Sequence, residues 1–285
     1  MRSPALYLAL FTFLYLKTSL AGVLDYHCSS KIFSGVNTKY CINQVDRTHN
    51  KDIIFFFHGI SGSEQSWFKK SDTRSIAKHW LARKYEPTVI SISFGPVWML
   101  VANQKFQYLN LFREQILPYL ENEVGGLSGG RRMVIGQSMG GFNAAEASLR
   151  NPGMFSRVVL LCPALTVMGP FATPDEIDDY KQRTHAESLL VDSIIDISKR
   201  YIVDQADWDQ HDPMKLPAIY PTEILKPLYY VSTGRGDNFG FQEGSEIFVE
   251  TIKKYGFQAQ WAPVYGWHCS FNRQGAADFI RGVSK

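Results

Sequence analysis

The chain has 285 residues, of which 45% are hydrophobic and 20% are charged, with 30 Lys and Arg against 27 Asp and Glu. This near-average composition excludes a disordered, collagen-like or disulfide-dense protein. A chain of this length can bury one large core, and we expect a single domain.

The N-terminal segment is typical of a secretory signal peptide. Arg2 precedes an apolar run over residues 5–16, and Lys17 and the small-residue pattern Ser-Leu-Ala of residues 19–21 follow. The run is too short to span a bilayer, which takes a helix of about 20 residues. We expect cleavage after Ala21 and export to the periplasm or to the outside; an uncleaved N-terminal anchor is the alternative.

Removal of residues 1–21 leaves 28 basic and 27 acidic residues, a net charge of +1. This balance argues against nucleic-acid binding through a broad basic field. No later apolar run approaches membrane-spanning length, so we expect no stable membrane span after signal cleavage. The sequence does not indicate the oligomeric state.

The four cysteines lack metal-site spacing such as C-x-x-C. Cys28 and Cys41 flank a predicted hairpin turn at residues 34–37, and an exported protein meets oxidising conditions. We therefore expect a Cys28–Cys41 disulfide. Cys162 ends an apolar run over residues 158–162, where a buried small hydrophobe is expected rather than a redox group.

Beyond residue 50, short apolar runs alternate with segments of helical length, after two β-like segments around residues 23–29 and 38–45. Continuously apolar runs are what strands buried on both faces need. The pattern predicts the α/β class, with a mostly parallel central sheet flanked by helices. The expected strands are residues 53–57, 89–92, 133–135, 158–161, 228–231 and 258–264.

Two helices and one insertion are expected between these strands. Apolar residues at three- and four-residue steps predict a helix over residues 106–120, and a second begins after Ser138 and ends at residues 151–153, Asn-Pro-Gly. Residues 163–222 hold six prolines, with eleven acids against five bases from residue 164 onward. This stretch is too long for an ordinary connection and predicts an inserted helical cap. Its charge favours a neutral or cationic substrate, unless it is only a solvated face.

Residues 136–140 read Gly-Gln-Ser-Met-Gly, a G-x-S-x-G pattern. The pattern follows a predicted strand and opens a predicted helix, and this strand–turn–helix setting is what places a serine on a tight, strained turn. The flanking glycines are needed because a side chain there would collide with the neighbouring strand or helix. Ser138 is the candidate nucleophile; an ordinary turn serine is the alternative.

A serine hydroxyl needs a base to take its proton, and that base needs an orienting acid. His268 lies on the loop after the last predicted strand, and Asp237 on the loop after the strand before it, in the order expected after such a serine. A helix-capping role for His268 and a turn role for Asp237 are the alternatives. Three aspartates of the cap are rivals to Asp237: Asp207, Asp209 and Asp212.

Acyl transfer also needs donors aimed at the developing oxyanion. One is expected to be the backbone N–H of Met139, the residue after the serine. The other is assigned to the N–H of Ile60, with Gly59 or Ser61 as alternatives, because a His-Gly pair ends the run over residues 53–57. His58 is expected to be a structural hydrogen-bonding residue beneath this loop.

Four short motifs together resemble the α/β-hydrolase superfamily: His58-Gly59, residues 136–141, Gly234-x-Gly-Asp237-x-Phe239 and Gly266-x-His268. Within it the chain is similar, over about residues 51–282, to the “putative esterase” group, which includes S-formylglutathione hydrolases, enterochelin and feruloyl esterases and antigen 85 mycolyltransferases.

The resemblance implies an α/β-hydrolase fold, a Ser138, Asp237 and His268 triad, an oxyanion hole from Ile60 and Met139, and neither cofactor nor metal. The cap at residues 163–222 and the loop at residues 93–98 depart from the group, so the substrate does not transfer.

The leading hypothesis is an exported serine hydrolase that cleaves carboxylic esters of a small molecule, a carbohydrate or a lipid through an acyl-enzyme. An acyltransferase is the first alternative, since aromatic loops could exclude water or stack a sugar ring. An inactive binding module and a peptidase are the others. The tryptophans expected in loops are Trp67, Trp98, Trp208 and Trp267.

Overall fold

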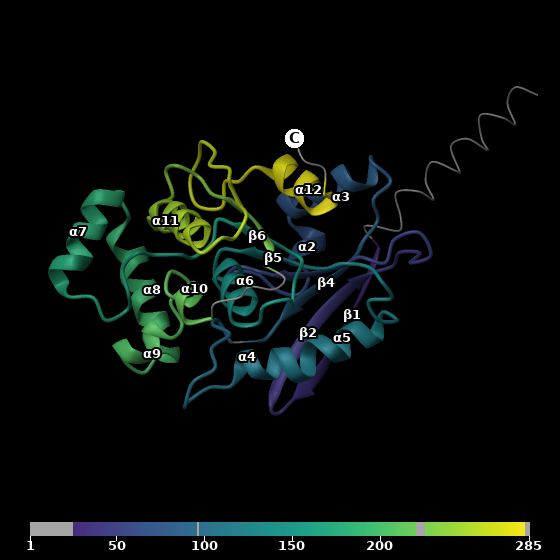
Figure 1. The fold of residues 1–285 in the computed structure, drawn as a ribbon, viewed down its shortest axis with the longest axis horizontal. Coiled ribbons are helices and arrows are strands. Elements are labelled where there is room, and N and C mark those ends of the chain that lie inside the picture. Colours follow the sequence, from purple (N-terminus) through teal and green to yellow (C-terminus); the bar gives the residue numbers. More distant parts are fainter. Residues whose placement is uncertain (1–24, 96, 221–225, 283–285) are drawn as a thin grey trace, which may run out of the picture.

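The computed structural model describes residues 25–95, 97–220 and 226–282. The predicted signal peptide, residues 1–21, lies outside these ranges, as do residues 221–222 at the end of the predicted cap. The centre is an eight-stranded sheet in the order β1-β2-β4-β3-β5-β6-β7-β8 (Figure 1). Its strands are β1 Tyr26–Phe33, β2 Val36–Asn43, β3 Ile53–Phe57, β4 Thr88–Ser93, β5 Arg132–Gln137, β6 Arg157–Leu161, β7 Leu228–Ser232 and β8 Ala259–Trp261.

The sheet is antiparallel only where β1 pairs with β2 and β2 with β4; the other pairs are parallel. In the register, Phe57 of β3 pairs with Gly136 of β5, and Gln137 pairs with Leu161 of β6. The carboxyl ends of these neighbouring strands therefore meet at one edge. Ligands of open α/β sheets bind at such an edge.

Helices cover both faces of the sheet, and the strands are apolar on both sides as a result. Along β3, Phe55 and Phe57 join the core of one face while Ile54 and Phe56 join the core of the other. The first face carries α4 Tyr108–Leu111, the π-helical segment η1 Phe112–Ile116, α5 Leu117–Glu123, α6 Met139–Arg150 and α11 Phe241–Lys254. The second carries α2 Ser66–Lys69, α3 Ser71–Leu81 and α12 Arg273–Arg281. The mixed α/β class and the mostly parallel sheet are confirmed.

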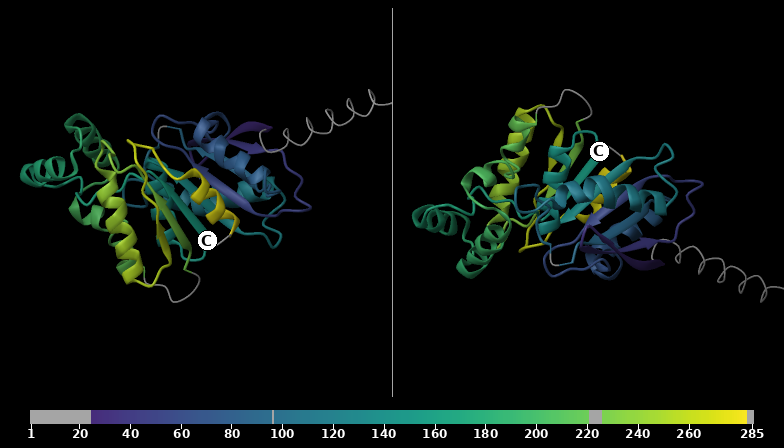
Figure 2. Two further views of the ribbon diagram at one scale, coloured as in Figure 1. Left: turned by 90° about the horizontal axis from the view of Figure 1, so that it is seen from above. Right: turned by 90° about the horizontal axis from the view of Figure 1, so that it is seen from below.

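Four helices occupy the segment between β6 and β7: α7 Pro174–Thr184, α8 Ser188–Tyr201, α9 Gln205–Asp209 and α10 Leu216–Ile219. Figure 1 shows α7, α8 and α9 grouped at one end of the molecule, away from β1 and β2, and in both views of Figure 2 they stand out from the body. A capping box between Thr173 and Glu176 begins α7. This segment has a small core of its own, formed by Met168, Tyr180, Val191 and Ile195.

A buried ion-pair cluster joins the cap to α6. The Nδ1 atom of His211 contacts the Oε1 atom of Glu146, and both side chains are almost fully buried. The Nη1 atom of Arg150 lies 3.2 Å from the same carboxylate oxygen, and its Nη2 atom donates to the Tyr220 hydroxyl at 2.9 Å. Because α6 begins directly after Ser138, this cluster holds the cap against the helix that carries the candidate nucleophile.

Three sequence expectations differ from the structure. The last strand covers only residues 259–261 rather than 258–264, although Val264 still forms an isolated bridge with Gly234. Trp67 lies in α2 rather than in a loop, buried and stacked on Trp80, and Trp208 lies in α9. In the described part of the chain, no helix combines the length and the apolar character needed to cross a membrane.

Candidate active site

Ser138 is held in a strained backbone conformation between β5 and α6. Its φ of 54° and ψ of −119° lie in a region that side-chain-bearing residues rarely adopt. The turn leaves no room beside it: a Cβ on Gly140 would lie 2.1 Å from the carbonyl oxygen of Phe57, and one on Gly136 would lie 2.1 Å from that of Gly140. The glycines of the motif therefore allow α6 to start against the sheet, with Ser138 at its edge.

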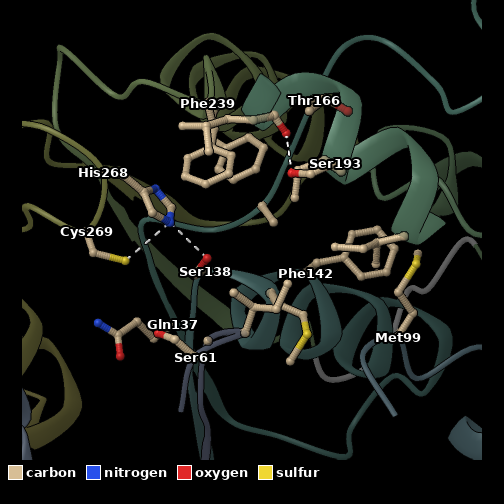
Figure 3. A pocket seen from close by; sticks show the side chains of 18 of the residues that line it. Ser61, Met99, Gln137, Ser138, Phe142, Thr166, Ser193, Phe239, His268 and Cys269 are labelled. Carbon is tan, nitrogen blue, oxygen red and sulfur yellow. Dashed lines mark hydrogen bonds between the residues drawn. The ribbon is translucent and has the colours of Figure 1, made fainter. Parts of the chain in front are cut away.

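His268 and Asp237 meet Ser138 in a continuous hydrogen-bonded row. The Oγ atom of Ser138 lies 2.9 Å from Nε2 of His268, and Nδ1 of His268 lies 2.8 Å from Oδ2 of Asp237. Ser138 and Asp237 are buried, while the His268 side chain is 19% exposed (Figure 3). The row has the geometry in which a histidine can accept the serine proton.

The carboxylate of Asp237 is fixed by its own loop. Its Oδ1 atom accepts a hydrogen bond of 2.9 Å from the N–H of Phe239, which leaves Oδ2 to face the imidazole. The three rival aspartates are engaged elsewhere: Asp207 faces His211, Asp209 pairs with Lys215, and Asp212 accepts from the N–H of Met214.

Sequence reasoning did not find the groups that surround the imidazole. The rings of Phe239 and Phe241 lie 4.5 Å and 5.5 Å from that of His268. Both stand shortly after Asp237 in the sequence, and their aromatic character close to that residue was the available signal.

The expectation for Cys162 as an unpaired buried hydrophobe is wrong, because Cys162 forms a disulfide with Cys269. The bond joins the end of β6 to the residue after His268, and the Sγ atom of Cys269 lies 3.5 Å from Nε2 of His268. These two sulfurs and His268 are close enough to share a metal ion, but sulfurs bonded to each other are not the thiolates that such a site needs. The predicted Cys28–Cys41 disulfide is present.

The backbone N–H groups of Ile60 and Met139 both belong to residues that line the same cavity as Ser138. Neither donates a hydrogen bond to another described residue. Gly59 allows the loop to come close, since a Cβ there would lie 3.1 Å from Cβ of Ser138. Beneath the loop, Nδ1 of His58 lies 2.7 Å from the carbonyl oxygen of Gly59, and burial lowers the pKa of His58. His58 is thus a neutral structural group.

A cavity of about 540 Å³ opens beside Ser138 and runs beneath the cap. This volume lies within the range of small-molecule binding sites. One face of α8 forms its roof, a role that the sequence analysis did not assign, although the apolar spacing over residues 190–197 was visible. The apolar lining residues are Met99, Met139, Phe142, Leu190, Ile194, Ile197, Trp208, Phe239 and Phe241.

The acidic residues of the cap do not face this cavity. Among the described lining residues, the charged ones apart from His268 are Lys70 and Asp72, and Asp72 pairs with Arg273 at 2.6 Å. The negative charge of the cap is therefore a solvated face and does not bear on the charge of a ligand in this cavity.

Comparison with known proteins agrees with this geometry. The family described as “Putative esterase” matches residues 99–275, well over half of the chain. No curated protein sequence is significantly similar. Among solved structures, a ferulic acid esterase has a TM-score of 0.63 at 16% identity, with 90% of this chain and 95% of that one covered.

Two S-formylglutathione hydrolases are also similar in structure. The one from Agrobacterium tumefaciens has a TM-score of 0.57 at 14% identity, covering 90% of this chain and 91% of its own. The one from Staphylococcus aureus has a TM-score of 0.58 at 17% identity, covering 90% and 95%. At these identities the likeness concerns the fold.

Proposed function

The chain belongs to this esterase family and is an ester hydrolase, and from that premise we propose that it is a serine carboxylesterase with Ser138, His268 and Asp237 as its catalytic triad. The observation that carries the proposal is the 2.9 Å separation between the Ser138 hydroxyl and Nε2 of His268. That distance allows the proton to move as the serine attacks.

In the first step, Oγ of Ser138 bonds to the ester carbonyl carbon while its proton passes to Nε2 of His268. The resulting imidazolium is stabilised by the buried carboxylate of Asp237, which accepts from Nδ1. The electron pair of the C=O bond moves onto oxygen. The N–H groups of Ile60 and Met139 then donate to this oxyanion, because no described residue already uses them.

In the second step, the carbon–oxygen bond to the alcohol breaks, and His268 returns its proton to the leaving oxygen. Ser138 is left as an acyl ester. Water repeats the sequence from the same side, with His268 again taking a proton, and releases the carboxylic acid.

The test compares turnover of p-nitrophenyl acetate by the wild type and by Ser138→Ala, with Ser193→Ala as control. Ser193 also lines the cavity, but its hydroxyl donates to the carbonyl of Leu190 within α8. Loss of the nucleophile is expected to lower kcat by at least roughly 10³-fold, and the control by little. Near-normal turnover in Ser138→Ala would refute the assignment.

We also propose that the protein is exported and that residues 1–21 are removed. Support comes from the charge and apolar pattern of those residues and from the two disulfides, which persist in oxidising compartments. N-terminal sequencing of the protein recovered outside the cytoplasm is expected to begin at Gly22. A cell-associated chain that begins at its original N-terminus would count against cleavage.

A further inference from the structure

We propose that the part of the cavity beneath α8 binds the acyl chain of the substrate, that this chain is apolar and longer than acetyl, and that α8 sets the preferred length. The proposal rests on the proposed function, because it assigns one side of the bond that Ser138 attacks.

The position of His268 decides which half of an ester lies beneath α8. The leaving alcohol must lie within hydrogen-bond reach of Nε2 of His268 to receive its proton. Figure 3 shows His268 and Cys269 on one side of Ser138 and Phe142 and Met99 on the other. The alcohol therefore leaves beside His268, and the group bonded to the carbonyl carbon extends toward Phe142.

That side of the cavity is built from hydrocarbon. Leu190, Ile194 and Ile197 follow one another at steps of four and three on α8, so they share a face, and all three line the cavity. Opposite them, Phe142 of α6 stacks on Trp208 of the cap, with ring centroids 6.2 Å apart and planes 12° from parallel.

Two hydroxyl groups in this region are already committed. Ser193 donates to the carbonyl of Leu190 at 2.7 Å, and Thr166 donates to that of Met168 at 2.6 Å. The residues that α8 contributes to the lining carry no charge. A polar or ionised acyl group would lose its water here without replacement, whereas an alkyl or aryl chain gains from burial.

The expected consequence is a chain-length optimum. In a series of p-nitrophenyl esters with a constant leaving group, kcat/KM is expected to rise by up to roughly fourfold for each added methylene until the cavity is filled. A series with constant acetyl and lengthening alcohols is expected to show a much flatter response.

Two adjacent leucines on α8 provide a matched test. Leu190 lines the cavity, whereas Leu189 is 84% exposed and does not line it. Leu190→Trp fills the space beneath α8 and is expected to move the optimum of the acyl series to shorter chains, with a loss of at least tenfold on the longest. Leu189→Trp adds the same bulk on the same helix and is expected to leave the profile unchanged. Ile194→Trp is a second probe of the cavity.

Hydrolysis of the acetyl ester by each variant serves as the check on folding and on the triad. If Leu190→Trp and Ile194→Trp keep acetyl activity but leave the acyl profile unchanged, or change only the alcohol series, the acyl assignment is overturned while the proposed function stands. If the folded wild type hydrolyses no ester in either series, the serine esterase proposal itself fails, and this one with it.

Discussion

Nδ1 of His268 lies 2.8 Å from Oδ2 of Asp237, and the N–H of Phe239 occupies the other carboxylate oxygen. Asp237 can therefore accept from His268 with one oxygen and keep Nε2 free to accept the Ser138 proton. An amide in its place can turn its NH₂ group toward Nδ1, which would move the histidine proton to Nε2.

Asp237→Asn is for this reason expected to lower kcat by roughly 10⁴-fold with little change in stability. Steady-state kinetics on a p-nitrophenyl ester, with thermal unfolding as the check on folding, measures both effects. A folded variant with kcat within tenfold of the wild type would show that Asp237 does not orient the base.

The Cys162–Cys269 disulfide is expected to contribute to activity as well as to stability. It closes a sequence separation of 107 residues, against 13 for Cys28–Cys41. In the chain-entropy account its removal costs about 5 kcal/mol of unfolding free energy, and removal of the other about 3 kcal/mol. Because Cys269 adjoins His268, the double variant Cys162→Ala/Cys269→Ala is also expected to lower kcat by roughly 10- to 100-fold.

The matched control is Cys28→Ala/Cys41→Ala, since these residues face each other across β1 and β2 at the far edge of the sheet. Denaturant unfolding and steady-state kinetics of both double variants give the comparison. Equal kcat values in the two folded variants would mean that the disulfide beside His268 has no positioning role.

Burial raises the pKa of Asp212, in the cap, to about 6 from its ordinary value of 3.8. The folded protein thus holds a buried charge above pH 6, which reduces stability there. Asp212→Asn is expected to raise the free energy of unfolding at pH 8 by about 2 kcal/mol, since the amide oxygen can still accept from Met214. As the pH falls through 6 toward 4, the wild type binds a proton on folding and the advantage of the variant disappears.

Asp209→Asn is the control for this pH dependence. Asp209 is on the surface, and its hydrogen bond with Lys215 lowers its pKa. Its replacement is expected to bring no gain in stability at pH 8. Urea unfolding from pH 4 to pH 8 measures both variants, and a stability gain of Asp212→Asn that is independent of pH would contradict the buried-charge explanation.

Much of the fold could be predicted from local patterns. Residues 53–57 and 158–161 are continuously apolar because strands in this sheet are covered on both faces, and β3 and β6 lie there. The turn at Ser138 was visible because glycines are required on both sides of it. His268 could be chosen among seven histidines because its place after the last strand brings it to the same sheet edge as the serine.

The rest depended on contacts between distant segments. Cys162 looks like any small residue of a buried strand, and only the path of the chain brings Cys269 beside it. The direction in which the acidic side chains of the cap point is likewise set by the packing of Val191 and Ile195 against Tyr180, which turns the opposite face of α8 toward the cavity. Trp67 was expected in a loop because the four-residue helix α2 has too few residues to show a period.

The most direct test of a nucleophilic Ser138 is covalent labelling of the purified protein with a fluorophosphonate, followed by mass spectrometry of the intact chain and of its peptides. The account predicts one phosphonyl group per chain, located on Ser138, and no labelling of Ser138→Ala. Labelling of a different residue, or none in the folded wild-type protein, would contradict the proposed mechanism.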